Sequence, residues 1–104
     1  MTVADILNQA RGRLVEAFGQ RFRGAVLYGS RARGDSRTDS DIDLMVLLEG
    51  PIRFGQDLQT IIHAIYPLQL ETDFIIDAWP VDIRSYEAQE FAVYRHAKHE
   101  GVPL

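Results

Sequence analysis

Residues 26–48 read VLYGSRARGDSRTDSDIDLMVLL, and this stretch decides the fold that the sequence predicts. It opens as an apolar run typical of a short buried strand, breaks at Gly29 and Ser30, and becomes apolar again after a polar loop. Asp41 and Asp43 stand at the start of the second run with one residue between them. Because residues i and i+2 of a strand share a face, both carboxylates should project together. The stretch therefore predicts a turn and a pair of acids suited to a metal-bound triphosphate.

The N-terminal segment has the pattern of an amphipathic helix over residues 3–18, with apolar side chains recurring at helical spacing. Thr2 and Asp5 resemble a capping box at its start, with aspartate in the usual place of glutamate. Gly19 is expected to end this helix.

The remaining elements follow from apolar periodicity and from turn residues. Their order, helix–strand–strand–helix–strand–helix, predicts an α+β fold with a small mixed sheet covered by helices, in one domain over residues 1–104. After the first helix we expect strands over 24–28 and 41–48, a helix from Phe54 that ends before Pro67, a strand over 73–79, and a last helix that is capped by Ser85 and stopped by Gly101 and Pro103.

Composition limits the classes of function. The 104 residues carry a net charge of −4, which argues against a broad nucleic-acid or anionic-membrane surface. Without cysteine there is no disulfide or thiol catalysis, which fits a reducing compartment. No signal peptide or apolar run of membrane-spanning length is apparent, so we expect a cytoplasmic protein. The sequence leaves its oligomeric state open.

The loop and the acids have complementary chemistry. Gly29 permits a sharp turn that brings backbone N–H groups close to a ligand, and a helical turn over 30–33 would aim its positive end at phosphate. Asp41 and Asp43 would repel each other without a cation, and Mg²⁺ prefers such oxygen ligands. Two metal ions can hold the attacking and leaving oxygens of a displacement at phosphorus.

Neither the glycine-serine turn nor the aspartate pair is specific for a function alone, but together they resemble the motif of a known family. The run G-S-x-A-R-G-D over residues 29–35, followed by S-D-x-D-L over residues 40–44, resembles the signature of the DNA-polymerase-β-like nucleotidyltransferases. Within this superfamily the chain is most similar to the minimal nucleotidyltransferase (MNT) proteins, which are antitoxin-type partners of HEPN-domain proteins. The remaining helices and strand agree in order, so the resemblance covers the whole chain.

The resemblance implies a role for each matching residue. Gly29 and Ser30 would hold the β- and γ-phosphates of a nucleoside triphosphate, and Asp41 and Asp43 would carry two magnesium ions. Arg33 also matches the motif and would brace the loop or approach phosphate. The second glycine of the loop, Gly34, would be conformational.

The family also has a third carboxylate on the third strand, which binds one metal and activates the acceptor hydroxyl. Asp77, in the middle of the expected strand, is our choice for this catalytic and metal-binding role. Asp73 shares its predicted face, and Asp82 lies just past Pro80, so both stay open as alternatives.

Two aromatic residues lie close to these motifs. Tyr28 stands in an apolar run and is predicted to belong to the core. Trp79 could stack on adenine, although a tryptophan at a strand end is more often part of a core or an interface.

The resemblance implies a Mg²⁺-dependent enzyme that transfers AMP from ATP to a hydroxyl of a HEPN-type toxin and so acts as an antitoxin. Larger relatives that modify small molecules carry extra helical domains for the acceptor, and this chain has room for about one helix after its third strand. Two alternatives stay open: an antitoxin that neutralises its partner by binding alone, and a nucleotidyltransferase acting on a small molecule such as an aminoglycoside.

Overall fold

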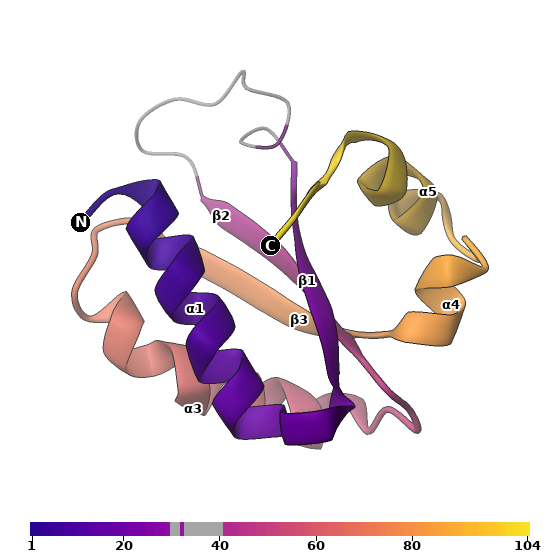
Figure 1. The fold of residues 1–104 in the computed structure, drawn as a ribbon, viewed down its shortest axis with the longest axis horizontal. Helices are drawn as coiled ribbons and strands as arrows, with labels where there is room; N and C mark the ends of the chain where they lie inside the picture. The colour runs from indigo at the N-terminus through magenta and orange to yellow at the C-terminus, as the bar shows by residue number, and fades with distance from the viewer. Residues whose placement is uncertain (30–31, 33–40) are drawn as a thin grey trace.

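The computed structural model of the chain describes residues 1–29, 32 and 41–104 (Figure 1). Within these residues, helices and strands alternate in the order that the sequence predicts, with a few additions near the C-terminus. The elements are α1 (Val3–Phe18), the short 3-10 helix η1 (Gly19–Arg21), β1 (Phe22–Tyr28), β2 (Ile42–Leu48), α3 (Phe54–Gln69), β3 (Ile76–Asp82), α4 (Ile83–Glu87), α5 (Ala92–Glu100) and β4 (Val102–Pro103).

The strands of the described residues form one mixed sheet in the order β3-β2-β1-β4. β1 runs antiparallel to β2 and to β4, whereas β2 and β3 run parallel. The antiparallel pair is joined through the glycine-containing loop, and the parallel pair is joined through helix α3, which is the usual crossover between parallel strands. The predicted α+β class with a small mixed sheet is confirmed.

Helices cover both faces of this sheet, with α1 and α3 on one side and α4 and α5 on the other (Figure 1). The side chains of β2 alternate between the two layers: Leu44 and Val46 pack in the α1/α3 cluster, and Met45 and Leu47 pack in the α4/α5 cluster. This explains why the MVLL end of β2 has no polar face.

Helix α1 begins and ends where the sequence predicts. Thr2 and Asp5 form a reciprocal capping box, and Gly19 is the C-cap with φ 57°. Ile6, Ala10 and Leu14 are fully buried at helical spacing, so this face fixes α1 on the sheet.

Helix α3 continues past Pro67 to Gln69, so the predicted end before Pro67 is wrong. Leu68 in the added turn is fully buried, and burial of a leucine contributes about 1.5–3 kcal/mol. The Gln69 side chain also donates to the Phe74 carbonyl at 2.6 Å and accepts from the Ile76 N–H at 2.8 Å. These contacts offset the hydrogen bond that proline removes.

Strand β3 starts and ends three residues later than the predicted 73–79. The predicted strand ends before Pro80, but proline is tolerated at a sheet edge when its missing N–H would point away from the neighbouring strand. The Ile42 N–H donates to the Ile75 carbonyl at 2.8 Å, and the alternation that follows places Pro80 on the outer side of β3. Asp73 therefore lies in the bend before the strand.

The prediction of a single C-terminal helix capped by Ser85 is wrong, because the structure has two helices there, α4 and α5. Ser85 lies inside α4, which is capped by the Asp82 carboxylate accepting from the Arg84 N–H at 2.8 Å. Gln89, with φ 54°, separates α4 from α5. After Gly101, the short strand β4 pairs with β1, an element that two residues of sequence give no means to predict.

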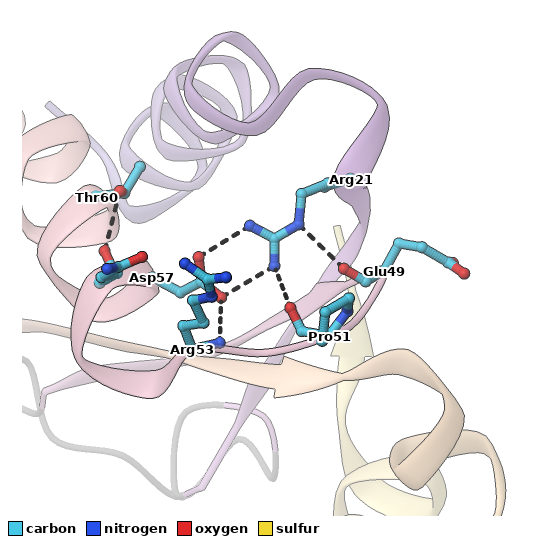
Figure 2. Close-up of polar contacts among 7 residues, drawn as sticks. Arg21, Glu49, Pro51, Arg53, Asp57 and Thr60 are labelled. Atoms are coloured by element: carbon cyan, nitrogen blue, oxygen red, sulfur yellow. Dashed lines mark hydrogen bonds and ion pairs between the residues drawn. The ribbon is translucent and has the colours of Figure 1, made fainter.

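A partly buried ion pair joins the first turn of α3 to the segment before β1 (Figure 2). The Arg21 guanidinium donates to both carboxylate oxygens of Asp57, at 2.9 and 3.0 Å, and also to the carbonyls of Glu49 and Pro51. The Asp57 carboxylate additionally accepts from the Arg53 N–H at 3.1 Å. This network ties η1, the β2–α3 turn and the first turn of α3 together at one end of the sheet.

None of the helices that the structure describes is long and apolar enough to cross a membrane.

The hydrogen bonds from Arg21 lower the pKa of the Asp57 carboxyl below its ordinary value of 3.8. Asp57→Asn should therefore reduce the free energy of unfolding by about 1–3 kcal/mol at pH 7, because it removes a charged partner from a bidentate pair. A depressed folded-state pKa stabilises the fold above the unfolded pKa, and this stability is lost as the pH falls through the folded value. Denaturant titrations should thus show the wild type and the variant converging below about pH 4.

Glu49→Gln is a matched control, since it removes the exposed ion pair between Glu49 and Arg23 at 2.7 Å but leaves the Glu49 carbonyl in place. We expect it to change stability by about 0.5 kcal/mol or less. Equal losses in the two variants would contradict a special role for the Arg21–Asp57 pair.

Candidate functional site

Three polar side chains form a row across the sheet at the end of β1 and the start of β2. Tyr28 pairs with Asp43 in the antiparallel register of β1 and β2, and Asp43 pairs with Asp77 in the parallel register of β2 and β3. Residues paired in this way project from the same face. The row lies on the face that α4 and α5 cover, because Trp79, two residues after Asp77, packs with the α4/α5 cluster.

Asp43 is the partly buried centre of this row. Burial raises the pKa of its carboxyl, and the negative charges of Asp77 and then Asp41 raise it further. Two other carboxylates therefore act on Asp43 at this end of the sheet. Such a site gains stability when a cation binds, because the cation removes the repulsion.

Among the three candidates for the third carboxylate, the structure places only Asp77 beside Asp43. Asp73 lies in the bend before β3. Asp82 pairs with Leu48 at the far end of β2, where its side chain caps α4. The choice of Asp77 is thus consistent with the register of the strands, and its catalytic role remains a prediction.

Gly29 approaches the central carboxylate closely. It follows β1 with φ +81°, a backbone conformation that other residues rarely adopt, and a Cβ added to it would lie 2.9 Å from Oδ2 of Asp43. The glycine therefore keeps the space next to the carboxylate clear of a side chain. From the sequence, this glycine is expected to clear space for phosphate, and in the structure it also clears space for Asp43.

The other predicted site residues are less completely described. Asp41 is exposed and lies just before β2, within electrostatic reach of Asp43. Ser30, Arg33 and Gly34 lie outside the described residues, as does most of the predicted helical turn over 30–33.

The carboxylates of the row are chemically suited to Mg²⁺, although no three histidine, aspartate or glutamate side chains of the described residues are gathered closely enough to hold an ion by themselves. Mg²⁺ is commonly held by one or two carboxylates together with water and substrate phosphates. Asp43 and Asp77, side by side with cleared space at Gly29, meet that requirement. The full set of Asp41, Asp43 and Asp77 as ligands stays a prediction.

Comparison with known proteins fits this geometry. Residues 15–103 match the family described as polymerase beta, nucleotidyltransferase. The chain belongs to this nucleotidyltransferase family. Members generally use a nucleotide substrate and a divalent metal, so the family supports a transferase. No curated protein matches the chain.

Two solved structures share the fold. A protein from Sulfolobus solfataricus, provisionally described as a nucleotidyltransferase, has a TM-score of 0.68 and 16% identity, over 95% of this chain and 76% of that one. A chain of a mutant toxin–antitoxin pair, MntA–HpeT, has a TM-score of 0.56 and 16% identity, over 100% of this chain and 72% of that one. At this identity the likeness concerns the fold.

Gly29→Ala tests the close approach to Asp43. The added methyl group would strain the backbone and displace the Asp43 carboxylate, so we expect a loss of on the order of 1–3 kcal/mol in stability and at least roughly tenfold weaker binding of Mn²⁺. Chemical denaturation and calorimetric titration with Mn²⁺ measure the two effects.

Gly12→Ala provides the control, because Gly12 lies within α1 and a Cβ there would meet nothing within 4 Å. It should stabilise the protein by about 0.4–1 kcal/mol and leave Mn²⁺ binding unchanged. Unchanged Mn²⁺ binding in Gly29→Ala as well would show that the glycine does not serve the carboxylate.

Proposed function

We propose that this chain transfers AMP from ATP to a hydroxyl group of a partner protein, using Mg²⁺ at the Asp43–Asp77 pair, and that this modification neutralises the partner as an antitoxin does. The observation that carries the proposal is the strand register that sets Asp77 beside Asp43 in a chain of the nucleotidyltransferase family. The fold neighbour from a toxin–antitoxin pair supports a protein partner, and the resemblance to MNT proteins favours one of the HEPN type.

In this proposal, different residues would bind the metal, bind the phosphates and accept the proton. Bound Mg²⁺ would supply positive charge to the triphosphate and to the developing transition state. Asp43 and Asp41 would hold the metal, and Gly29 with Ser30 would let backbone N–H groups approach the phosphates. Asp77 would accept the proton of the acceptor hydroxyl while the new oxygen–phosphorus bond forms at the α-phosphorus and the bond to pyrophosphate breaks.

An apolar surface along α3 and before β3 suits a protein acceptor. Ile62, Tyr66, Leu70 and Ile75 are 51%, 57%, 69% and 60% exposed. Helix α3 has one charged residue at neutral pH, Asp57, which is buried in its ion pair. So large an uncharged surface on a soluble domain is typical of an interaction site.

This surface borders the edge strand β3, which carries Asp77 on the opposite face of the sheet. A pocket of about 100 Å³ lies between α3 and β3 and is lined by residues that include Ile62, Tyr66 and Ile76. Ile76 directly precedes Asp77 on the edge strand β3. We therefore assign the α3–β3 surface to the partner protein, whose apolar side chains would enter the pocket while another part of the partner passes the edge of β3 and brings its hydroxyl to Asp77.

The direct test is a transfer assay with the protein encoded by the neighbouring gene. The two purified proteins are mixed with Mg²⁺ and ATP labelled on the α-phosphate, and the labelled protein is identified by mass spectrometry. We expect label on a hydroxyl residue of the neighbour, most simply a tyrosine. Asp43→Ala and Asp77→Ala should each reduce the rate by at least about a hundredfold, since each removes a group that acts on the reacting atoms.

The outcomes separate the competing functions. No label, together with a tight complex that Asp43→Ala leaves intact, would overturn transfer and show an antitoxin that acts by binding. Label on an added small hydroxyl compound in the absence of the neighbour would instead show a small-molecule transferase.

The docking surface can be tested separately. Ile62→Glu places a charge in the apolar surface and should weaken the complex with the partner by at least roughly tenfold, as measured by calorimetry, without changing nucleotide binding. Gln56→Glu adds the same charge at an exposed position near the start of the same helix and should leave the affinity unchanged. Equal affinities for all three proteins would place the partner elsewhere.

A further inference from the structure

The outer edge of β3 carries backbone groups that the sheet leaves unpaired. The Ile42 N–H donates to the Ile75 carbonyl, and in a parallel ladder every second residue of a strand then turns both of its backbone groups toward the neighbouring strand. Asp77 and Trp79 are therefore bonded to β2, whereas the N–H and the carbonyl of Ala78 point away from it. Among the described residues, no hydrogen bond reaches either group of Ala78. Because Ala78 is only 8% exposed, leaving these groups without a partner costs free energy.

A pocket lies beside this unpaired edge, on the α1/α3 face of the sheet. Its volume is about 100 Å³, and Ile76 and Ala78 line it together with side chains of α3. Before Ala78 the edge is already occupied, because the Ile76 N–H donates to the Gln69 side chain at 2.8 Å. After Ala78 comes Pro80 on the outer side, which has no N–H to donate. The stretch of edge that can pair with another chain is therefore short and centred on Ala78, next to the pocket.

Asp77 lies on the same edge strand but faces the other side of the sheet. Its side chain is exposed and shares a face with Trp79 of the α4/α5 cluster, whereas Ala78 packs in the α1/α3 cluster. If a strand were added along β3, the residue opposite Ala78 would point toward the pocket, and its neighbour opposite Asp77 would point toward the carboxylate. Side chains opposite each other in paired strands have Cβ atoms about 4.5–5.5 Å apart. One added strand would therefore reach the pocket and the Asp77 carboxylate together.

The surface around this edge is acidic. Residues 54–83 contain five acids and no lysine or arginine. Three of these acids, Glu71, Asp73 and Asp77, are exposed shortly before β3 or in its first turn of pleat. Complementary charge steers partners to such a surface, and like charge repels the wrong ones. A segment that binds at this edge should therefore carry lysine or arginine.

We propose that β3 accepts an extended, basic segment of the partner protein as an added strand, with one apolar side chain in the α3–β3 pocket and an adjacent hydroxyl residue beside Asp77. The N–H and the carbonyl of Ala78 form the central hydrogen bonds of this pairing, as in other cases of strand addition to an exposed sheet edge. This inference rests on the proposed function, because it describes how the acceptor hydroxyl of that reaction is presented. It accounts for a single partner that serves a pocket and a carboxylate on opposite faces of the sheet.

The direct test is amide hydrogen exchange of the isotope-labelled protein, followed by NMR, alone and in complex with the protein encoded by the neighbouring gene. We expect the partner to slow exchange of the Ala78 amide at least roughly tenfold more than exchange of the Asp77 and Trp79 amides, because only the Ala78 amide gains a hydrogen bond. The other two are internal controls, since they are already bonded to β2 in the free chain. Equal slowing of all three amides would overturn strand addition.

Ala78→Pro removes the outward N–H and leaves the bonds between β3 and β2 in place, as Pro80 does on the same edge. We expect its affinity for the partner, measured by calorimetry, to fall at least roughly tenfold. Circular dichroism and thermal melting establish that the variant is folded. Wild-type affinity in folded Ala78→Pro would overturn the proposal, and if the variant does not fold, the exchange measurement on the wild type decides the question.

The charge of the segment is tested by Glu71→Gln combined with Asp73→Asn. Removing both charges should weaken the complex about fivefold or more at low salt and make its affinity less dependent on salt. Glu16→Gln combined with Glu90→Gln is the matched control, because it removes two exposed charges away from β3, and it should leave the affinity unchanged. Equal affinities for both double variants would overturn the basic character of the segment.

The outcomes separate this inference from the proposed function. Label on the neighbour, with no selective protection of the Ala78 amide and wild-type affinity in Ala78→Pro, would overturn strand addition and leave AMP transfer standing. Selective protection of the Ala78 amide in a complex that gains no label would overturn transfer and support strand addition. Absence of any complex with the neighbour would overturn both.

Discussion

The parallel pairing of β2 with β3 is the constraint on which the candidate site depends. This register sets Asp77 beside Asp43, and a shift by one residue would turn Asp77 to the opposite face, among the side chains under α1 and α3. The alternating burial of β3 opposes such a shift, because Ala78 packs in one apolar layer and Val81 in the other, and the shift would place Asp77 in the core. The hydrophobic pattern that makes the fold therefore also assembles the acids.

The two ends of the sheet differ in their electrostatics. At one end, Arg21 and Asp57 neutralise each other and satisfy the carbonyls of the β2–α3 turn. At the other end, burial and the negative charges of Asp77 and Asp41 raise the pKa of Asp43. The first arrangement stabilises the fold by itself, whereas a bound cation would relieve the repulsion among the acids of the second. Such local cost at a functional site is compensated by the packing around it.

Much of the fold and of the candidate site could be predicted from the sequence, because the patterns that indicate them lie in short stretches of the chain. The capping box of α1, the periodicity of its apolar residues and the strand–glycine–aspartate pattern each depend on neighbours in the chain. The errors arose where tertiary contacts decide: Leu68 and Gln69 extend α3 past Pro67, the sheet edge admits Pro80 into β3, and β4 exists only through its pairing with β1. The hydrogen bond from the Trp79 indole to the Tyr28 hydroxyl could not be predicted for the same reason, since it joins residues 51 positions apart.

The central claim is that Asp43 and Asp77 hold one cation together. It is tested most directly by a crystal structure with Mn²⁺ and an ATP analogue that cannot be cleaved at the α-phosphate, with the metal located by its anomalous scattering. We predict an anomalous peak in direct contact with the carboxylates of both Asp43 and Asp77 and with phosphate oxygens of the analogue. A peak bound to other residues, or Asp77 turned away from the metal, would contradict the account.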